Sequence, residues 1–228
     1  MLTIIENARN SGRKYLNEIE SKQLLKEAGV QTTDTRLATS GAEAVALARE
    51  IGFPVVLKIV SPDIVHKSDI GGVKVGLADS AAVGAAYDEI LAAAQAKQPG
   101  SRIDGVSVQN MAKSGVEVIV GMSKDSQFGP VLMFGMGGVL VELLEDVSFR
   151  IVPITQRDAG KMIHEIKSFP LLEGYRGSEP ADIKALEDIL LKISALVAKT
   201  PEIKEMDINP IFARRGDAIA VDARIILE

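Results

Sequence analysis

The segment Ser61-Pro62-Asp63-Ile64-Val65-His66-Lys67-Ser68-Asp69-Ile70-Gly71-Gly72-Val73-Lys74-Val75-Gly76 decides how the fold of this chain is interpreted. It follows an apolar run, residues 53–60, that is typical of a buried strand and contains one lysine. It ends in an alternating Val-Lys-Val strand. The segment is therefore predicted to be a loop between two strands.

The residues of this loop favour phosphate chemistry. Gly71 and Gly72 can turn backbone N–H groups toward an anion because neither carries a Cβ, and Lys58 on the preceding strand supplies positive charge. His66 adds a nucleophile, since an imidazole can carry a phosphoryl group covalently. Each residue also has a simpler interpretation: a surface histidine, a turn made by two glycines, and a lysine that extends from an edge strand into water.

The composition excludes several classes of protein. A net charge of -5 over 228 residues, without a cluster of Lys and Arg, argues against a nucleic-acid partner. The absence of cysteine removes disulfides, thiol catalysis and Cys-ligated zinc. No apolar run reaches the roughly 18 residues of a membrane-spanning helix, and the first residues are too polar for a signal peptide. We therefore expect a cytoplasmic protein without a membrane partner.

Apolar periodicity and turn residues predict two α/β units. The first contains helices over residues 2–11, 17–28, 42–51 and 80–97, with strands near 35–38, 53–60 and 73–75. The second contains strands over 105–111, 115–122, 131–135 and 139–142, which are expected to form an antiparallel meander, helices over 155–169 and 182–198, and a final hairpin of 203–213 and 218–224.

The final hairpin contains a second candidate site. Asn209 on its first strand and Asp222 on its second carry oxygen atoms within otherwise apolar strands, and Mg²⁺ bound to nucleotide phosphates prefers such ligands. Two simpler interpretations remain open: Asn-Pro often ends a strand, and Asp222 can pair with Arg224 or cap a turn.

Five of these segments, in the order in which they occur, resemble the beta subunit of ADP-forming acetyl-CoA synthetase. They are residues 53–58, 61–73, 129–138, 205–210 and 221–224. The resemblance covers nearly the whole chain. The chain is similar more distantly to the beta subunit of succinyl-CoA synthetase, in which the loop before Gly-Gly-Val is rich in glycine, whereas here this loop carries His66.

The resemblance implies an ATP-grasp fold of the α/β (α+β) class, in which two subdomains hold ATP or ADP. Residues 1–19 would form an N-terminal helix on the second subdomain, residues 20–102 the small lid subdomain, and residues 103–228 the large subdomain with the adenine hinge and the metal site. By position in the family's motifs, His66 would be the phosphohistidine. The implied nucleotide contacts are Lys58, Gly71, Gly72, Val108, Gln109, Met111 and Glu117, and the implied Mg²⁺ ligands are Asn209 and Asp222.

The resemblance also implies a reaction and a partner. The reaction is acyl-CoA + ADP + phosphate to carboxylate + CoA + ATP, with Mg²⁺ on the nucleotide and a phosphoryl group passed from a histidine of the alpha subunit through His66 to ADP. The chain has no Gly-rich Rossmann opening and no length for a CoA-binding domain. It would therefore be half of an enzyme, whose CoA-binding alpha subunit completes a hetero-oligomer, α2β2.

Two other functions are consistent with the same residues. One is an ATP-grasp ligase that joins a carboxylate to an amine or thiol through an acyl phosphate, without a phosphohistidine. The other is a regulatory module that senses ADP or ATP for a partner and catalyses nothing. Labelling of His66 by phosphate separates the ligase from the relay enzyme. The regulatory module instead predicts nucleotide binding that survives loss of His66 and a holoenzyme without turnover.

Overall fold

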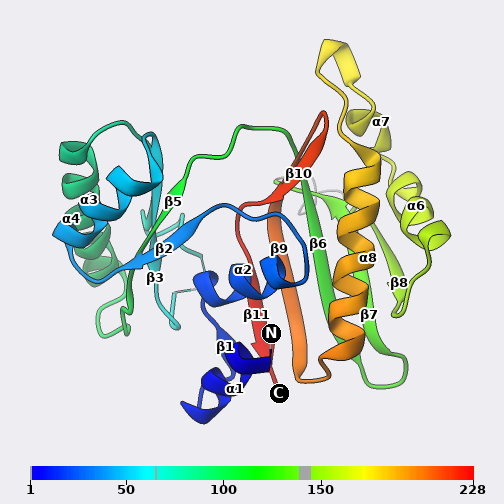
Figure 1. Ribbon diagram of the computed structural model, residues 1–228, viewed down its shortest axis with the longest axis horizontal. Coiled ribbons are helices and arrows are strands. Elements are labelled where there is room, and N and C mark those ends of the chain that lie inside the picture. Colours follow the sequence, from blue (N-terminus) through cyan, green and yellow to red (C-terminus); the bar gives the residue numbers. More distant parts are fainter. Residues whose placement is uncertain (1, 65, 139–144) are drawn as a thin grey trace. The chain divides into compact units, whose positions relative to one another are not determined.

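The computed structural model describes residues 2–64, 66–138 and 145–228. The chain divides into two compact units, shown in Figure 1. The small unit comprises residues 33–111, and the large unit comprises residues 1–32 together with residues 112–228. No helix in the described part of the chain is long and apolar enough to span a membrane.

The small unit is a four-stranded antiparallel sheet with two helices on one face. Its strands follow the order β2-β5-β3-β4. Their bounds are β2 Thr35–Ala38, β3 Val55–Val60, β4 Val73–Leu77 and β5 Gly105–Asn110, and the helices are α3 Gly41–Ile51 and α4 Ser80–Lys97. Val55, Leu57 and Ile59 alternate along β3 and pack in one core with residues of both helices. The intervening residues of β3 therefore belong to the opposite face of the sheet.

Both helices of the small unit begin where the sequence supplies a capping side chain. Ser40 Oγ accepts a hydrogen bond from the backbone N–H of Glu43 and so caps the N-terminus of α3. Asp79 Oδ1 accepts one from Ala82 at the start of α4. Each cap satisfies an N–H group that has no partner within its own helix.

The large unit is built on a sheet of seven described strands in the order β1-β11-β9-β6-β7-β8, with β10 paired to β9. The bounds are β1 Tyr15–Leu16, β6 Val116–Asp125, β7 Gly129–Met136, β8 Val147–Ile151, β9 Ile203–Arg214, β10 Asp217–Ala220 and β11 Arg224–Leu227. The helices are α1 Leu2–Asn10, α2 Glu18–Glu27, α6 Gln156–Glu165, α7 Phe169–Leu172 and α8 Ile183–Lys199, with a 3₁₀ turn, η1, at Tyr175–Gly177. Residues of α1, α2, α6 and α8 share one core with one face of this sheet, and Figure 1 shows α2 and α8 over that face.

The structure departs from the expected organisation in the placement of β5. This strand was expected to open the second unit, but it pairs with β2 and with β3, so the small unit extends to residue 111 rather than 102. The small unit also starts later than expected, at residue 33 rather than 20, because Leu24 and Leu25 of α2 pack in the core of the large unit. The edge strand β8 was not expected from the sequence, and the expected strand 139–142 lies outside the described residues.

A buried carboxylate directly before β8 binds the segment that connects α6 to α7. Asp146 is 5% exposed, and its two oxygens accept hydrogen bonds from the backbone N–H groups of Lys167 and Ser168, each at 2.7 Å. Burial acts to raise the pKa of this carboxyl group, but the hydrogen bonds from Ser168 and Lys167 outweigh it and lower the pKa. The ionised form of Asp146 therefore stabilises the large unit.

Replacing Asp146 with asparagine is expected to lower the free energy of unfolding by about 1.5–3 kcal/mol at pH 7, because one charged acceptor of two backbone N–H groups is lost. Since the folded-state pKa lies below the unfolded value, this contribution is present at neutral pH and is lost as the pH falls through the folded-state pKa. Urea unfolding between pH 3 and pH 8 measures it. The matched control Asp188→Asn, at a surface ion pair with Lys192, should change stability by no more than about 0.5 kcal/mol. A gap between Asp146→Asn and wild type that does not depend on pH would contradict this account.

Candidate active site

His66 is exposed in the middle of the loop that joins β3 to β4. Ile64 precedes it and Ile70 follows it, and both pack in the core of the small unit, where they are 3% and 6% exposed. The apolar side chains at both ends therefore hold the loop down and leave His66 in contact with water.

Three hydrogen bonds fasten the same loop to the rest of the small unit. Ser61 Oγ donates to the carbonyl oxygen of Arg102 at 2.6 Å, and the backbone N–H of Arg102 donates to Asp63 Oδ2 at 2.7 Å. Lys97, at the end of α4, donates from Nζ to the carbonyl oxygen of Asp69 at 2.9 Å. The loop is thus held to the segment before β5 and to α4.

Gly71 and Gly72 have a different role from the one expected. Their N–H groups donate within the loop, from Gly71 to the carbonyl oxygen of Ser68 at 3.0 Å and from Gly72 to that of Lys67 at 2.8 Å. A Cβ on Gly72 would lie 2.7 Å from Ile59 Cγ2 and 2.8 Å from the Lys67 oxygen. These two glycines therefore close the turn behind His66, and the prediction that their N–H groups face a phosphate does not fit this arrangement.

Lys58 lies on the face of the small sheet that α3 and α4 do not cover. Its neighbours in the ladder are Val73 on β4 and Ser107 on β5, and Ser107 Oγ donates to the Lys58 carbonyl oxygen at 3.4 Å. The lysine is only 5% exposed, so the alternative of an edge lysine reaching into water is wrong. A cation held on this face of the sheet suits an anionic group brought to it.

The side chains of the three predicted hinge residues differ in how accessible they are to a ligand. Val108 is fully buried in the core with α3 and α4, so its side chain is not available to a ligand. Gln109 is 1% exposed, and its Oε1 accepts hydrogen bonds from the hydroxyl groups of Thr33 at 3.5 Å and Thr35 at 3.4 Å. Met111, which follows β5, is 48% exposed. Of the three side chains, that of Met111 is the most accessible to an adenine ring.

Glu117 lies near the start of β6 and is exposed, as a ligand contact requires. The two glycines that follow β7, Gly137 and Gly138, lie close to Glu117. Gly137 donates its N–H to the Glu117 carbonyl oxygen at 2.7 Å, and a Cβ on Gly137 would lie 3.0 Å from the Glu117 Cβ. Gly138 follows with a positive φ of 64°, where its Cβ would lie 3.4 Å from Glu117 Oε2. These glycines are therefore required by the close approach of β7's end to Glu117.

The two predicted metal ligands are brought together by the C-terminal segments of the large unit. Asn209 lies on β9 and is exposed. Asp222 does not lie on a strand, as was expected, but in the connection between β10 and β11, where its Oδ1 accepts the N–H of Ala223 at 2.9 Å. The neighbouring Val221 donates its N–H to the carbonyl oxygen of Pro210 at 2.9 Å. This hydrogen bond fixes the connection beside the residue that follows Asn209.

Asp207 is a second acidic residue of this region, beside Asp222, and the sequence analysis did not single it out. Asp207 as a residue is exposed, but neighbouring atoms shield its carboxyl group from water. This desolvation and the nearby negative charge of Asp222 raise the pKa of Asp207, while the guanidinium of Arg224, its partner across the ladder, opposes the rise. The sequence pattern that could have found it is the alternation Met206-Asp207-Ile208-Asn209, which places the two polar residues on the face opposite the buried pair.

These residues fit a magnesium ion. The described residues contain no group of three or more His, Cys, Asp or Glu side chains that could hold a metal by themselves. The candidate donors are instead the amide oxygen of Asn209 and the carboxylate of Asp222, and the carboxylate of Asp207 lies near that of Asp222. Mg²⁺ typically takes one or two carboxylates and completes its shell with water and phosphate oxygens.

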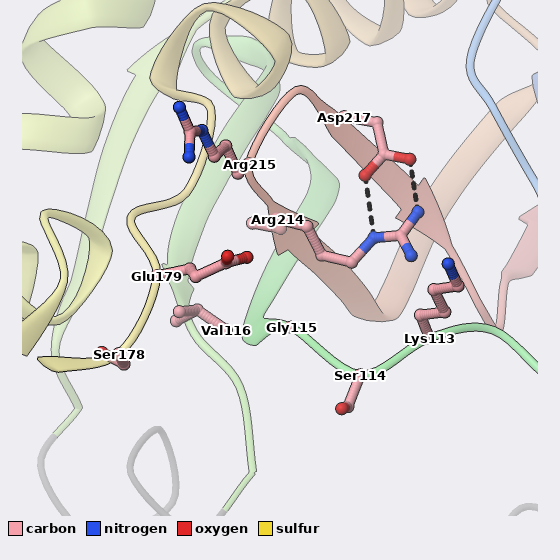
Figure 2. Close-up of a pocket in the computed structure, with 10 residues that line it drawn as sticks. Lys113, Ser114, Gly115, Val116, Ser178, Glu179, Arg214, Arg215 and Asp217 are labelled. Carbon is pink, nitrogen blue, oxygen red and sulfur yellow. Dashed lines mark hydrogen bonds and ion pairs between the residues drawn. The ribbon is translucent and has the colours of Figure 1, made fainter.

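A cavity of about 660 Å³ lies at the tip of the β9–β10 hairpin of the large unit. Figure 2 shows the side chains that line it. It is lined by Lys113, Ser114, Gly115, Val116, Ser178, Glu179, Ala213, Arg214, Arg215 and Asp217. Asp217 forms an ion pair with Arg214, whose Nε donates to it at 2.8 Å. None of the predicted site residues lines this cavity, although Val116 next to Glu117 does.

The comparisons with known proteins agree with this fold. A family model described as an ATP-grasp domain matches residues 7–227. The chain is 50% identical to subunit beta of acetate–CoA ligase (ADP-forming) I from Pyrococcus furiosus, over 98% of this chain and 96% of that one. It is 46% identical to acetate–CoA ligase (ADP-forming) I from Archaeoglobus fulgidus, over 98% of this chain but only 32% of that longer protein.

Two solved structures of the dinucleotide-forming acetyl-coenzyme A synthetase 1 of Candidatus Korarchaeum cryptofilum are also similar. One, in complex with coenzyme A, Ca-AMPCP and HgCl⁺, has a TM-score of 0.97 and is 49% identical, over 99% of both chains. The other, in complex with coenzyme A and Mg-AMPPCP, has a TM-score of 0.88 and is 47% identical, over 99% of both chains. In the latter, the phosphohistidine segment points towards the nucleotide binding site.

The family model and the two-sheet architecture define this chain as an ATP-grasp protein. Within that class, it belongs to the family of the beta subunits of ADP-forming acetate–CoA ligases. The fold class and the family that the sequence motifs indicated are thereby confirmed.

The role assigned to Gly72 can be tested by adding one methyl group. Gly72→Ala should lower the stability of the chain by about 1–3 kcal/mol, because the new Cβ overlaps Ile59 and the loop has to shift. The matched control is Gly84→Ala, within α4, where a Cβ has only Val45 at 4.0 Å and alanine favours the helix by up to about 1 kcal/mol. Denaturant unfolding measures both. Equal effects of the two substitutions would show that Gly72 is not required by the packing of the loop.

Proposed function

We propose that this chain is the nucleotide-binding subunit of an ADP-forming acyl-CoA synthetase and that His66 carries a phosphoryl group between the partner subunit and ADP. The overall reaction is acyl-CoA + ADP + phosphate to carboxylate + CoA + ATP. The observation that carries the proposal is the exposed imidazole of His66 in a loop that is held at both ends, since a group that accepts and releases phosphate must be both accessible and fixed.

In the proposed relay, a ring nitrogen of neutral His66 attacks the phosphorus of a phosphohistidine presented by the partner. A nitrogen–phosphorus bond forms on His66 as the one on the partner breaks. The terminal phosphate oxygen of ADP then attacks the same phosphorus, and His66 leaves as the free imidazole. Because the phosphoryl group moves twice without water, the exclusion of water from the phosphorylated loop is part of the mechanism.

The remaining residues are proposed to hold the nucleotide. Lys58 neutralises phosphate charge, and Gln109 and Met111 contact the adenine end, where Val108 contributes only its place in the strand. Glu117 takes a hydrogen bond from the nucleotide. Gly71 and Gly72 act indirectly, since they support the loop of His66.

Asn209 and Asp222 are proposed as the ligands of Mg²⁺, with Asp207 close by. When bound, the ion neutralises charge on the nucleotide phosphates during transfer. The carboxylates supply the negative charge that attracts the ion to β9. The positive charge of Arg224 offsets part of the negative charge of Asp207.

The proposed partner is a CoA-binding alpha subunit in an α2β2 hetero-oligomer in the cytoplasm. Two comparisons support this proposal. The Pyrococcus relative is a subunit beta, and this chain matches only 32% of the Archaeoglobus relative, so the remainder of such an enzyme lies outside the matched segment.

His66→Asn tests the relay. The variant should bind Mg-ADP with unchanged affinity, because binding depends on the lysine and the metal site, but it should make no ATP from acyl-CoA when mixed with the partner subunit. Wild type incubated with Mg²⁺ and ATP labelled in the γ-phosphate should acquire an acid-labile, base-stable label at residue 66. ATP formation by the variant within a few-fold of wild type would overturn the relay and favour an ATP-grasp ligase without phosphohistidine. If wild type binds ADP but neither takes the label nor turns over with its partner, the chain is a nucleotide sensor.

Asp222→Asn tests the metal site. It should weaken Mg-ADP binding at least about tenfold, because one charged ligand of the ion is lost while the fold is retained. The matched control is Asp217→Asn at the start of β10, whose carboxylate pairs with Arg214 and should not affect the nucleotide. Isothermal titration calorimetry with ADP, with and without Mg²⁺, separates the metal from the nucleotide. An equal Mg-ADP affinity in Asp222→Asn and wild type would exclude Asp222 as a ligand.

A further inference from the structure

Arg224, the first residue of β11, carries a positive charge beside the candidate metal site of the large unit. It lies directly opposite Asp207 in the ladder between β11 and β9. Ala223 and Ile225, on either side of it, are buried in the core that the helices cover, whereas Arg224 itself is exposed. Because side chains alternate along a strand, that of Arg224 lies on the other face of the sheet, together with that of Asp207.

The candidate metal ligands lie close to Arg224 along the chain and across the ladder. Opposite residues of two antiparallel strands have Cβ atoms about 4.5–5.5 Å apart, and Arg224 and Asp207 form such a pair. Asp222 precedes Arg224 by two residues, Asn209 follows Asp207 by two, and two residues span at most about 7 Å. All four residues belong to the large unit, so one compact unit supplies the whole cluster.

The guanidinium of Arg224 is not engaged by the protein. Among the residues that the structure describes, the Arg224 side chain forms no ion pair and no hydrogen bond, although Asp207 is its neighbour across the ladder. A solvated surface arginine has no carboxylate beside it, whereas Arg224 has those of Asp207 and Asp222 nearby and pairs with neither. Its N–H groups are therefore left for a group that the protein does not supply.

The charges on this face of the sheet leave a role for a further cation. The carboxylates of Asp207 and Asp222, when both are ionised, balance the two positive charges of one Mg²⁺. A nucleotide brings additional negative charge, because phosphate oxygens complete the shell of an ion held by one or two carboxylates. Arg224 supplies a positive charge at this place, and a guanidinium can donate two parallel N–H groups to two oxygens of one phosphate.

We propose that Arg224 is a nucleotide-binding residue, whose guanidinium donates two hydrogen bonds to phosphate oxygens of the Mg-nucleotide at Asn209 and Asp222. The proposal rests on the proposed function, because it takes its ligand from the metal site described there. It adds a group that recognises the phosphates directly, whereas Asn209 and Asp222 act on them through the ion. In the alternative, structural role, Arg224 would only offset the charge of Asp207.

Isothermal titration calorimetry of the whole chain with Mg-ADP tests this assignment. Arg224→Gln should weaken Mg-ADP binding at least about tenfold, because two charge-assisted hydrogen bonds are lost. The matched control is Arg150→Gln, which removes the same type of side chain from β8, where it pairs with Glu165, and should leave the affinity unchanged. Thermal melting shows whether both variants fold.

A double-mutant cycle with Asp207→Asn separates a phosphate contact from compensation of charge. If Arg224 binds phosphate, Arg224→Gln weakens Mg-ADP binding in the Asp207→Asn background as well. If Arg224 only offsets the charge of Asp207, the loss of affinity disappears in that background, and the proposal is overturned.

If Arg224→Gln does not fold, Arg224→Lys keeps the charge without the planar fork and should weaken Mg-ADP binding about fivefold, the cost of one hydrogen bond. A folded variant of either kind that binds Mg-ADP as tightly as wild type overturns the proposal. If His66→Asn still forms ATP while Arg224→Gln binds Mg-ADP weakly, the assignment of Arg224 stands and the proposed relay fails. Wild type that binds no Mg-ADP refutes both.

Discussion

The close packing of Gly72 against Ile59 is the constraint on which the candidate phosphoryl-carrying loop depends. The backbone N–H of Ile59 donates to the Gly72 carbonyl oxygen at 2.7 Å, and the side chain of Ile59 occupies the space that a Cβ on Gly72 would need. Ile59 in turn is fully buried between the sheet and its helices. The place of His66 is therefore set by the core of the small unit, although His66 itself is exposed.

Secondary structure could be predicted from this sequence where local chemistry decides it. The strand 35–38 and the helix 80–97 were expected with the bounds that the structure has, and residues that end helices, Pro99 and Gly100, follow the helix directly. The sheet to which β5 belongs could not be predicted in this way. Its alternation is the same whichever partners it has, and pairing with β2 and β3 joins residues about 50 to 75 positions apart.

Part of the candidate site could be proposed from the sequence, again because local chemistry marks the residues. The sequence singles out His66, Lys58 and Asn209 because each is an unusual residue type for its local pattern, and their roles stay predictions. Asp207 was missed because an aspartate on the exposed face of a half-buried strand is ordinary, and only its proximity to Asp222 makes it notable. The two glycines were assigned the wrong contacts, since a sequence does not show whether an amide faces a ligand or its own loop.

The division of the chain has a consequence for the order in which it can fold during synthesis. The small unit begins and ends at adjacent positions, where Asp34 and Asn110 exchange hydrogen bonds of 2.8 and 3.2 Å, so it is complete once residue 111 has been made. The large sheet needs both extremes of the sequence, because Tyr15 and Leu16 of β1 pair with Ile226 and Ile225 of β11. On the ribosome, the first 32 residues must therefore wait, unpaired and in reach of chaperones, while the inserted unit behind them is already able to fold.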